Sequence, residues 1–102
     1  MTHFNQLSPA EAERLAMLAE ECGEVIQIIG KILRHGYESC HPGDQYQTVN
    51  RELLGSELAD MIAVVVRMSN SGDIGPLTTH IGSTDKIWKR KLRYAHHQEP
   101  KP

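Results

Sequence analysis

The sequence is poor in aromatic residues and in cysteine and has no long apolar run, and each shortage excludes a class of protein. Aromatic residues make up 5% of the 102 positions, a shortage that a helical fold tolerates better than a β-sandwich does. Two cysteines, Cys22 and Cys40, form no disulfide framework, and no CxxC or CxxH pair suggests zinc. The longest apolar stretch, residues 61–66, is far too short to span a bilayer. Residues 1–7 lack a signal-peptide core, so we expect a protein of the cytoplasm.

A strong net charge is also missing from the sequence. The formal net charge is −2, so the surface as a whole carries no field that favours nucleic acid or an anionic membrane. The length fits one domain over residues 1–102, with ends at 1–7 and 96–102 that we expect to be flexible. Because a domain this small buries only part of its apolar surface, a partner chain would help to stabilise it.

A long first helix is predicted by its cap and its apolar periodicity. Ser8, Pro9 and Glu11 are typical of a helix start, because serine can cap, proline suits the first position and glutamate completes a capping box. Helical periodicity then runs to about Arg34, and Gly36 predicts the end of the helix. The apolar stripe alternates spacings of three and four and contains Leu15, Leu18, Cys22, Val25, Ile29 and Ile32.

The rest of the chain is predicted to be a long loop and further helices. Residues 36–48 break every period, and loops of this length are often functional. A second helix is expected from Asn50, a possible cap, to about Met68. Pro76 opens a third helical region, which Gly82-Ser83 can divide in two. With no convincing strand, we predict an all-α fold, an antiparallel helix bundle of two long helices plus a C-terminal helical region, completed by dimerisation.

The acidic residues of the two long helices are placed in the same unusual way. On a helical wheel, Glu21 falls inside the apolar arc of the first helix and Glu24 falls at its edge. On the second helix Glu57 falls inside the arc and Asp60 at the edge. Each helix therefore has one acid in its apolar face and another one turn later at the border.

A carboxylate that faces a core costs several kcal/mol unless it is paired, protonated or bound to metal. No lysine or arginine falls at the matching depth, and oxygen ligands suit Mg²⁺ or Mn²⁺ better than zinc. The alternative, a solvated helix face, fits Glu11, Glu13 and Glu52 but fits Glu21 and Glu57 poorly. A ferritin-like di-iron site would need Glu-x-x-His pairs, which neither helix has.

Basic residues lie on two helical faces. Glu20, Glu24, Gln27, Lys31 and Arg34 form one stripe of the first helix, acidic at one end and basic at the other. Its cations could hold phosphate oxygens near a bound metal, although a solvated face with ion pairs explains them equally well. Lys86, Lys89, Arg90 and Arg93 share another side. They could form a second phosphate clamp, a nucleic-acid patch or a solubilising face, and the slight aromatic interleaving disfavours nucleic acid.

Two acidic motifs carry a family resemblance. Glu20-Glu21-Cys22-Gly23-Glu24 followed by Glu57-Leu58-Ala59-Asp60 resembles the EExxE…ExxD signature of the all-α NTP pyrophosphohydrolases, the MazG-like group. Single-domain phage and bacterial members are similar in their K-x-x-R-x-G run, here residues 31–36, and in an Asn before the second motif, here Asn50. The resemblance covers residues 15–66 well and the C-terminal third loosely. Two departures are the long spacer between the motifs and the interruption at residues 82–83.

The resemblance implies Mg²⁺-dependent hydrolysis of a nucleoside triphosphate or its deoxy form to the monophosphate and pyrophosphate, with Mn²⁺ as a substitute. By motif position it implies the metal ligands Glu21, Glu24, Glu57 and Asp60, with Glu20 as a further catalytic acid that orients or activates water. Substrate binding would fall to Lys31, Arg34, Asn50, Lys86, Lys89 and Arg93. Tyr37 and Tyr46 of the loop could contact the base.

Assembly and function leave alternatives open. We expect a homodimer or homotetramer, because three helical segments cannot cover all of the apolar stripes alone. A different class of function is a non-catalytic helical protein whose acids bind structural metal or a basic partner. Release of pyrophosphate from a nucleoside triphosphate distinguishes the enzyme from this alternative.

Overall fold

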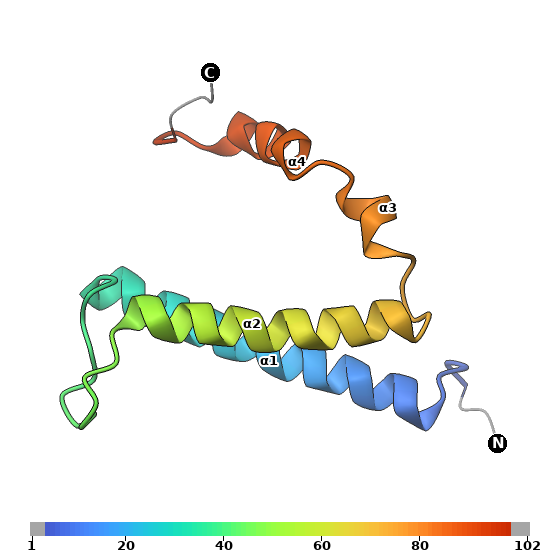
Figure 1. Ribbon diagram of the computed structural model, residues 1–102, viewed down its shortest axis with the longest axis horizontal. Helices are drawn as coiled ribbons and strands as arrows, with labels where there is room; N and C mark the ends of the chain where they lie inside the picture. The colour runs from blue at the N-terminus through green and yellow to red at the C-terminus, as the bar shows by residue number, and fades with distance from the viewer. Residues whose placement is uncertain (1–3, 99–102) are drawn as a thin grey trace.

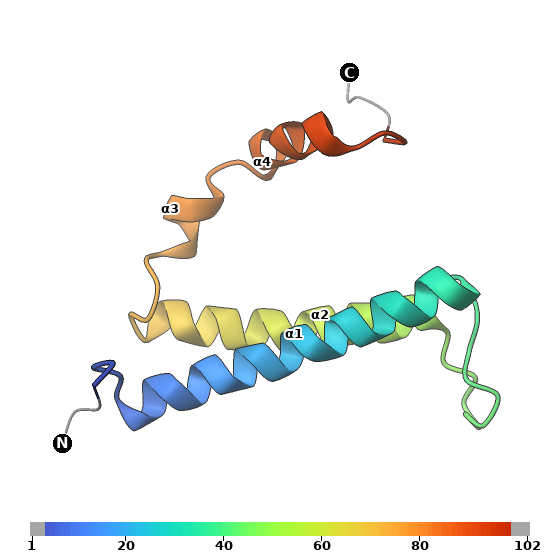
Figure 2. The same ribbon diagram turned by 180° about the vertical axis from the view of Figure 1, so that it is seen from behind.

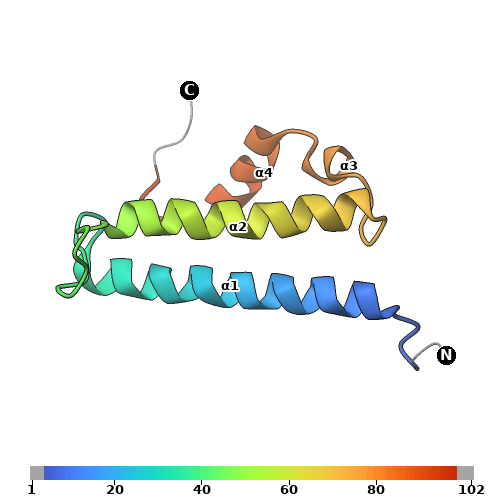
Figure 3. The ribbon, with the colours of Figure 1, turned by 60° about the horizontal axis from the view of Figure 1, so that its bottom comes forward.

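The computed structural model of the chain describes residues 4–98, and its centre is a hairpin of two long helices. α1 spans Pro9–His35 and α2 spans Asn50–Asn70. The two helices run antiparallel and pack against each other (Figures 1 and 3). The short helices α3 (Leu77–Ile81) and α4 (Thr84–Lys91) and the 3₁₀ turn η1 (Leu92–Tyr94) follow. The predicted all-α class is confirmed, since the described residues contain no strand and only an isolated bridge between Cys40 and Val49.

The ends of α1 are those that the sequence predicted. The Ser8 hydroxyl accepts the backbone N–H of Glu11 at 3.1 Å, and the Glu11 carboxylate accepts the N–H of Ser8 at 2.8 Å. This reciprocal capping box satisfies two backbone donors that a helix start otherwise leaves free. At the other end Gly36 has φ +90° and donates its N–H to Ile32 at 2.7 Å. A glycine is favoured there because other residues are strained at such an angle.

The start of α2 differs from the prediction. Val49, not Asn50, occupies the N-cap position, and Asn50 is the first residue of the helix. The Asn50 side chain is buried and donates its amide to the carbonyl of Gly36 at 3.1 Å. Asn50 therefore ties the start of α2 to the end of α1, and the cap interpretation is wrong.

The loop between α1 and α2 is held by backbone hydrogen bonds to α2. Asn50 donates its N–H to Ser39 at 2.8 Å, and Arg51 donates to Tyr37 at 2.9 Å. The tip of the loop is built on Asp44, whose carboxylate accepts two further backbone N–H groups. These donors, first among several causes, hold the pKa of Asp44 below its ordinary value. The loop is thus ordered by its own turn chemistry and by its attachment to α2.

An ion pair closes the other end of the hairpin. Arg14, near the start of α1, donates to both carboxylate oxygens of Asp73, just beyond α2, at 2.6 and 2.8 Å. The side chains are 20% and 9% exposed. The hydrogen bond to Arg14 lowers the pKa of Asp73, and the same bond raises that of Arg14. A bidentate Arg–carboxylate pair of this kind is stronger and more specific in its geometry than an ion pair with a single hydrogen bond.

The C-terminal region does not complete a bundle within the described part of this chain. Gly82, at φ +50°, ends α3, and the Ser83 hydroxyl caps α4, so the predicted division of this region is confirmed. Both short helices lie to one side of the hairpin rather than packed along it (Figure 2). The third helical segment therefore does not cover the apolar stripes of the hairpin.

Much apolar surface consequently stays exposed. The chain exposes 8443 Å² and has a radius of gyration of 17.5 Å, against about 5,800 Å² and about 13 Å for a compact monomer of this size. Ile28 and Met68 are the buried apolar residues among those described, whereas Leu15, Met17 and Ile29 of the predicted apolar face are exposed. Dimerisation stays a prediction, and the expected flexible ends fall partly on residues 1–3 and 99–102, outside the described ones. No helix within residues 4–98 has the length and apolarity needed to cross a membrane.

Candidate metal centre

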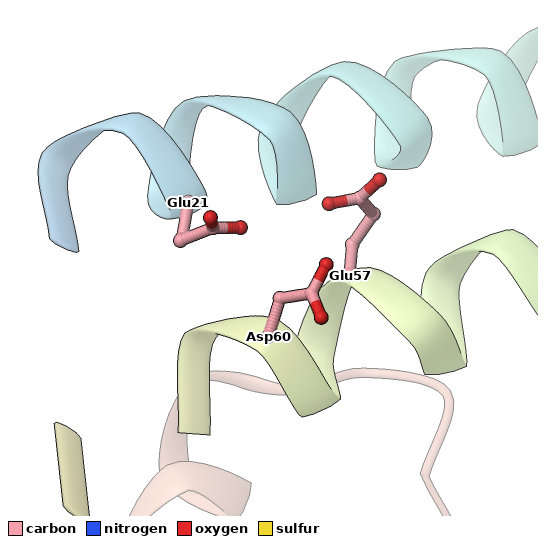
Figure 4. Close-up of side chains that lie close together, drawn as sticks. All are labelled: Glu21, Glu57 and Asp60. Carbon is pink, nitrogen blue, oxygen red and sulfur yellow. The ribbon is translucent and has the colours of Figure 1, made fainter. Parts of the chain in front are cut away.

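Three acids from the two long helices converge between them. Glu21 projects from α1, and Glu57 and Asp60 project from α2 into the same space (Figure 4). One carboxylate oxygen of each lies within 4.8 Å of the others. Glu57 and Asp60 are three residues apart, so one helical face presents both. The predicted inward direction of Glu21 and Glu57 is thus what the structure has.

The two inward acids each have a buried oxygen without a hydrogen-bond partner in the described part of the chain. Atom Oε2 of Glu21 and atom Oε2 of Glu57 are buried and have no hydrogen-bond partner among residues 4–98. The ion pairs found in that range join Arg14 to Asp73 and Arg51 to Glu38. No basic side chain therefore neutralises either acid there. Buried unpaired carboxylate oxygens are costly, and a bound cation is one of the few ways to compensate for them.

The repulsion among these acids acts on the pKa values of Glu21 and Glu57. Burial, followed by the charges of Glu24 and Asp60, raises the pKa of Glu21 above its ordinary value. The pKa of Glu57 is also raised, first by its contact with the Glu24 carboxyl group and then by burial. The charges of the neighbouring acids all act in the direction that opposes ionisation of Glu21 and Glu57. The cluster therefore favours the uptake of positive charge, as a proton or as a metal ion.

The donor set fits a hard divalent cation. All of the donors are carboxylate oxygens, which Mg²⁺ and Mn²⁺ prefer. Two oxygens bound to one Mg²⁺ at about 2.1 Å lie at most about 4.2 Å apart. One carboxylate oxygen of each acid lies within 4.8 Å of the others, which is close to that limit. Glu21, Glu57 and Asp60 are therefore the residues that could hold such an ion.

The other predicted acids differ in their distance from this centre. Glu24 is half-buried and lies against Glu57, so it belongs to the same cluster. Glu20 is exposed beside it, and its charge contributes to the raised pKa of Glu21. All five predicted acids thus lie in one region of the hairpin.

A groove leads from the acids toward the loop end of the hairpin. Its volume is about 330 Å³, and its walls are Glu24, Gln27, Ile28, Lys31, Leu53 and Glu57. Lys31 is the basic residue among the described walls of this groove, and it follows Glu24 by about two helical turns. Arg34 is exposed and its guanidinium folds back over Gly30, 3.5 Å from where a Cβ would be. Lys31 is therefore placed to meet an anion in the groove, and Arg34 does not line it.

The late basic residues do not reach the acids within this chain. Lys86 and Lys89 belong to α4 and Arg93 to η1, which lie apart from the hairpin (Figure 1). All three are exposed. Their predicted part in substrate binding stays a prediction, and it would require another copy of the chain or a movement of α4.

Sequence reasoning missed two features of the hairpin, one beside the acids and one at the loop end. The thiol of Cys22 contacts the sulfur of Met61 at 4.0 Å, which joins the helices beside the cluster. A second pocket at the loop end is lined by loop residues that include Cys40 and His41, not by Tyr37 or Tyr46. Only long-range pairing of the loop with α2 brings these residues together, and no periodicity in the sequence signals such pairing.

Comparison with known proteins agrees with this geometry. The model of the MazG nucleotide pyrophosphohydrolase domain matches residues 10–92, which contain both acidic motifs, the loop and α4. The comparisons with curated proteins and with solved structures gave no significant match. The match covers most of the 102 residues and includes every acid of the cluster. The chain therefore belongs to the MazG nucleotide pyrophosphohydrolase domain family.

Proposed function

We propose that this protein hydrolyses a nucleoside triphosphate, or its deoxy form, to the monophosphate and pyrophosphate in a reaction that needs Mg²⁺, with Mn²⁺ as a substitute. The observation that supports it most is the pair of buried, unpartnered oxygens on Glu21 and Glu57, which face each other across the hairpin within residues 4–98. Membership of the MazG family supports nucleotide pyrophosphohydrolase chemistry in general.

The proposed metal ligands are Glu21, Glu24, Glu57 and Asp60. When bound, the cation would neutralise phosphate charge and lower the pKa of the attacking water. The fit of the site rests on the acids themselves, because three of them already bring ligand oxygens within 4.8 Å of one another. Glu24 would join them from its position against Glu57.

The remaining residues would position water and phosphate. Glu20 is exposed at the edge of the cluster and would accept the proton of the attacking water. The water oxygen bonds to phosphorus as the α–β phosphoanhydride bond breaks, and pyrophosphate leaves. Lys31, in the wall of the groove, would hold the leaving phosphates with charge-assisted hydrogen bonds.

The test is a panel of nucleoside and deoxynucleoside triphosphates with identification of both products. With Mg²⁺ we expect pyrophosphate and monophosphate in equal amounts, and no product in excess chelator. Glu57→Gln should lower kcat by at least about 100-fold, since even indirect supports of a metal site cost about 10- to 100-fold. Glu52→Gln changes an exposed acid of the same helix and is the matched control.

A non-catalytic helical protein would give different results. If no triphosphate yields pyrophosphate, and Glu57→Gln behaves like Glu52→Gln, the enzymatic proposal is wrong. If metal binds without turnover, the acids serve a structural or interaction role instead.

A further inference from the structure

A second cavity lies beyond the groove, at the loop end of the hairpin. Its volume is about 230 Å³, below the about 300–1,000 Å³ of pockets that hold drug-sized ligands. The end of α1, the first half of the loop and the start of α2 form its walls, with Lys31, His35, Cys40, His41 and Asn50 among the lining residues. We call this cavity the loop pocket. Its size suits one part of a nucleotide rather than a whole one.

The lining of the loop pocket contains donors and a cation but no carboxylate. Lys31 supplies the positive charge, and the imidazoles of His35 and His41 supply ring N–H groups. The nearby Glu38 is engaged outside the pocket, because it accepts from the Arg51 guanidinium at 2.7 Å. A pocket of this composition favours an anion.

The orientation of His41 is fixed by the loop backbone. The N–H of Gly43 donates to Nδ1 of His41 at 2.9 Å. Nδ1 must therefore keep its lone pair, so the ring proton of the neutral imidazole is on Nε2. His41 thus presents a donor rather than an acceptor. A Cβ at Gly43 would lie 3.3 Å from two ring atoms of His41, so a side chain at this position would require the ring to shift by a few tenths of an ångström.

The wall of the pocket formed by Asn50 is also held in place by hydrogen bonds within the protein. Asn50 is buried and is fixed at both its side chain and its backbone, to Gly36 at 3.1 Å and to Ser39 at 2.8 Å. The bridge between Cys40 and Val49 continues this attachment. Preorganised walls lower the entropy cost of binding.

The order of the acids, Lys31 and the loop pocket along the hairpin suggests the direction in which a bound triphosphate would lie. Glu24 and Glu57 line the groove at the acidic end, and Lys31 lines both the groove and the loop pocket. A phosphate chain that begins at the acids and extends past Lys31 would therefore point toward the loop pocket. We infer that the loop pocket, through His35 and His41, holds the terminal phosphates that leave as pyrophosphate, while the nucleoside points toward the opposite end of the hairpin.

This inference rests on the proposed function, but binding of a product tests it separately from turnover. Calorimetry would measure inorganic pyrophosphate and, in a separate titration, a nucleoside monophosphate, each added to the Mg²⁺-loaded protein. His35→Gln and His41→Gln should each weaken pyrophosphate binding by about 10-fold, as expected for a lost hydrogen bond to a charged group. The monophosphate affinity should not change.

Two further variants make the test sharper. Gly43→Ala should weaken pyrophosphate binding to a smaller extent, because the new methyl group makes the His41 ring shift by a few tenths of an ångström. His97→Gln alters an exposed histidine near the C-terminus and should change neither affinity. Circular dichroism checks that each variant keeps its helices.

Each outcome decides the inference. A monophosphate affinity that falls in His35→Gln or His41→Gln, with pyrophosphate binding unchanged, would assign the pocket to the nucleoside and reverse the direction. If neither affinity changes, the pocket is no subsite. If the wild type binds pyrophosphate through these histidines yet hydrolyses no triphosphate, the proposed function fails while the anion subsite stands.

Discussion

Glu21 and Glu57 direct their carboxyl groups at each other across the hairpin, and each has one buried oxygen without a hydrogen-bond partner in the described part of the chain. Burial and neighbouring acids raise the pKa of both groups. In the absence of metal, ionisation of these groups opposes folding, since their charges repel in a poorly solvated place. Protons or metal ions can each relieve this repulsion.

The first prediction concerns pH and the metal-free protein. A glutamate whose folded pKa exceeds its unfolded value stabilises the fold below the unfolded pKa and loses this contribution as pH rises through the folded pKa. The ordinary value is 4.5, so in excess chelator Tm should fall as pH rises from about 4.5 toward neutrality. Glu57→Gln, which is neutral at every pH, should flatten this decline and be more stable than the wild type near pH 7. A chelated wild type whose Tm rises steadily over that interval would contradict the prediction.

The second prediction concerns metal and stability. If the ionised acids of the folded state hold Mg²⁺ or Mn²⁺ as proposed, either ion should raise Tm in a concentration-dependent way. Thermal unfolding at neutral pH measures the shift. Glu57→Gln should lose the response, and Glu52→Gln should keep it. An equal shift with Ca²⁺, Mg²⁺ and monovalent salt at matched ionic strength would indicate general screening instead of a site.

The third prediction concerns Lys31, whose charge should contribute to substrate binding but little to the stability of the fold. Lys31→Met keeps the length of the side chain and removes the charge that lines both the groove and the loop pocket. We expect kcat/KM to fall by about 10- to 100-fold, the range for a lost charge-assisted interaction, with little change in Tm. Arg34→Met is the paired variant, because Arg34 does not line the groove, and its kcat/KM should change much less. Equal losses of kcat/KM in the two variants would mean that the phosphates do not bind along this groove.

The fourth prediction contrasts two ion pairs. Asp73→Asn breaks the two-pronged pair with Arg14 and should lower Tm by about 4–8 °C, a size typical of one lost interaction in a small domain. Glu38→Gln removes the pair with Arg51, whose side chains are 71% and 60% exposed, and should have no measurable effect. The pKa of Asp73 is lowered from 3.8, so its contribution is present above that pH and is lost as the pH falls through the lower folded value. The two variants would be compared by thermal unfolding at neutral pH.

The fifth prediction concerns association. Leu33 is 82% exposed and Ile62 is 54% exposed, although both belong to the long helices. We expect light scattering to give the mass of two or four chains, because exposed apolar surface of this extent is typical of an interface. Leu33→Asp or Ile62→Asp should shift the distribution toward smaller species. Tyr46→Asp, in the exposed loop, serves as the control, and a wild type that is monomeric at high concentration would refute the prediction.

The sequence predicted the hairpin and its acids well, because both depend on local pattern. The capping box at Ser8, the glycine at Gly36 and the phase of Glu21 against Glu57 all follow from helical periodicity and short-range hydrogen bonds. The division at Gly82 follows in the same way, because a positive φ ends a helix wherever it occurs.

The features that sequence reasoning missed depend on contacts between distant segments. Asn50 is a residue type that often caps helices. Its side-chain amide instead donates a hydrogen bond to the Gly36 carbonyl, because the loop brings that carbonyl close. The approach of Cys40 to Val49 has no periodic signal. The position of α4 relative to the acids depends on packing that a single helix pattern does not specify, so the shared helical side of Lys86 and Lys89 does not predict their distance from the acids.

Interactions join the two long helices at both ends of the hairpin. Arg14 and Asp73 form an ion pair at one end, and Asn50 donates a hydrogen bond to the Gly36 carbonyl at the loop end. The acids lie between these two attachments and take part in neither. The acidic cluster and the two attachments therefore use different residues. If the acids hold a cation as proposed, they can be exchanged singly, to alter ion preference or to trap a bound substrate, without loss of either attachment.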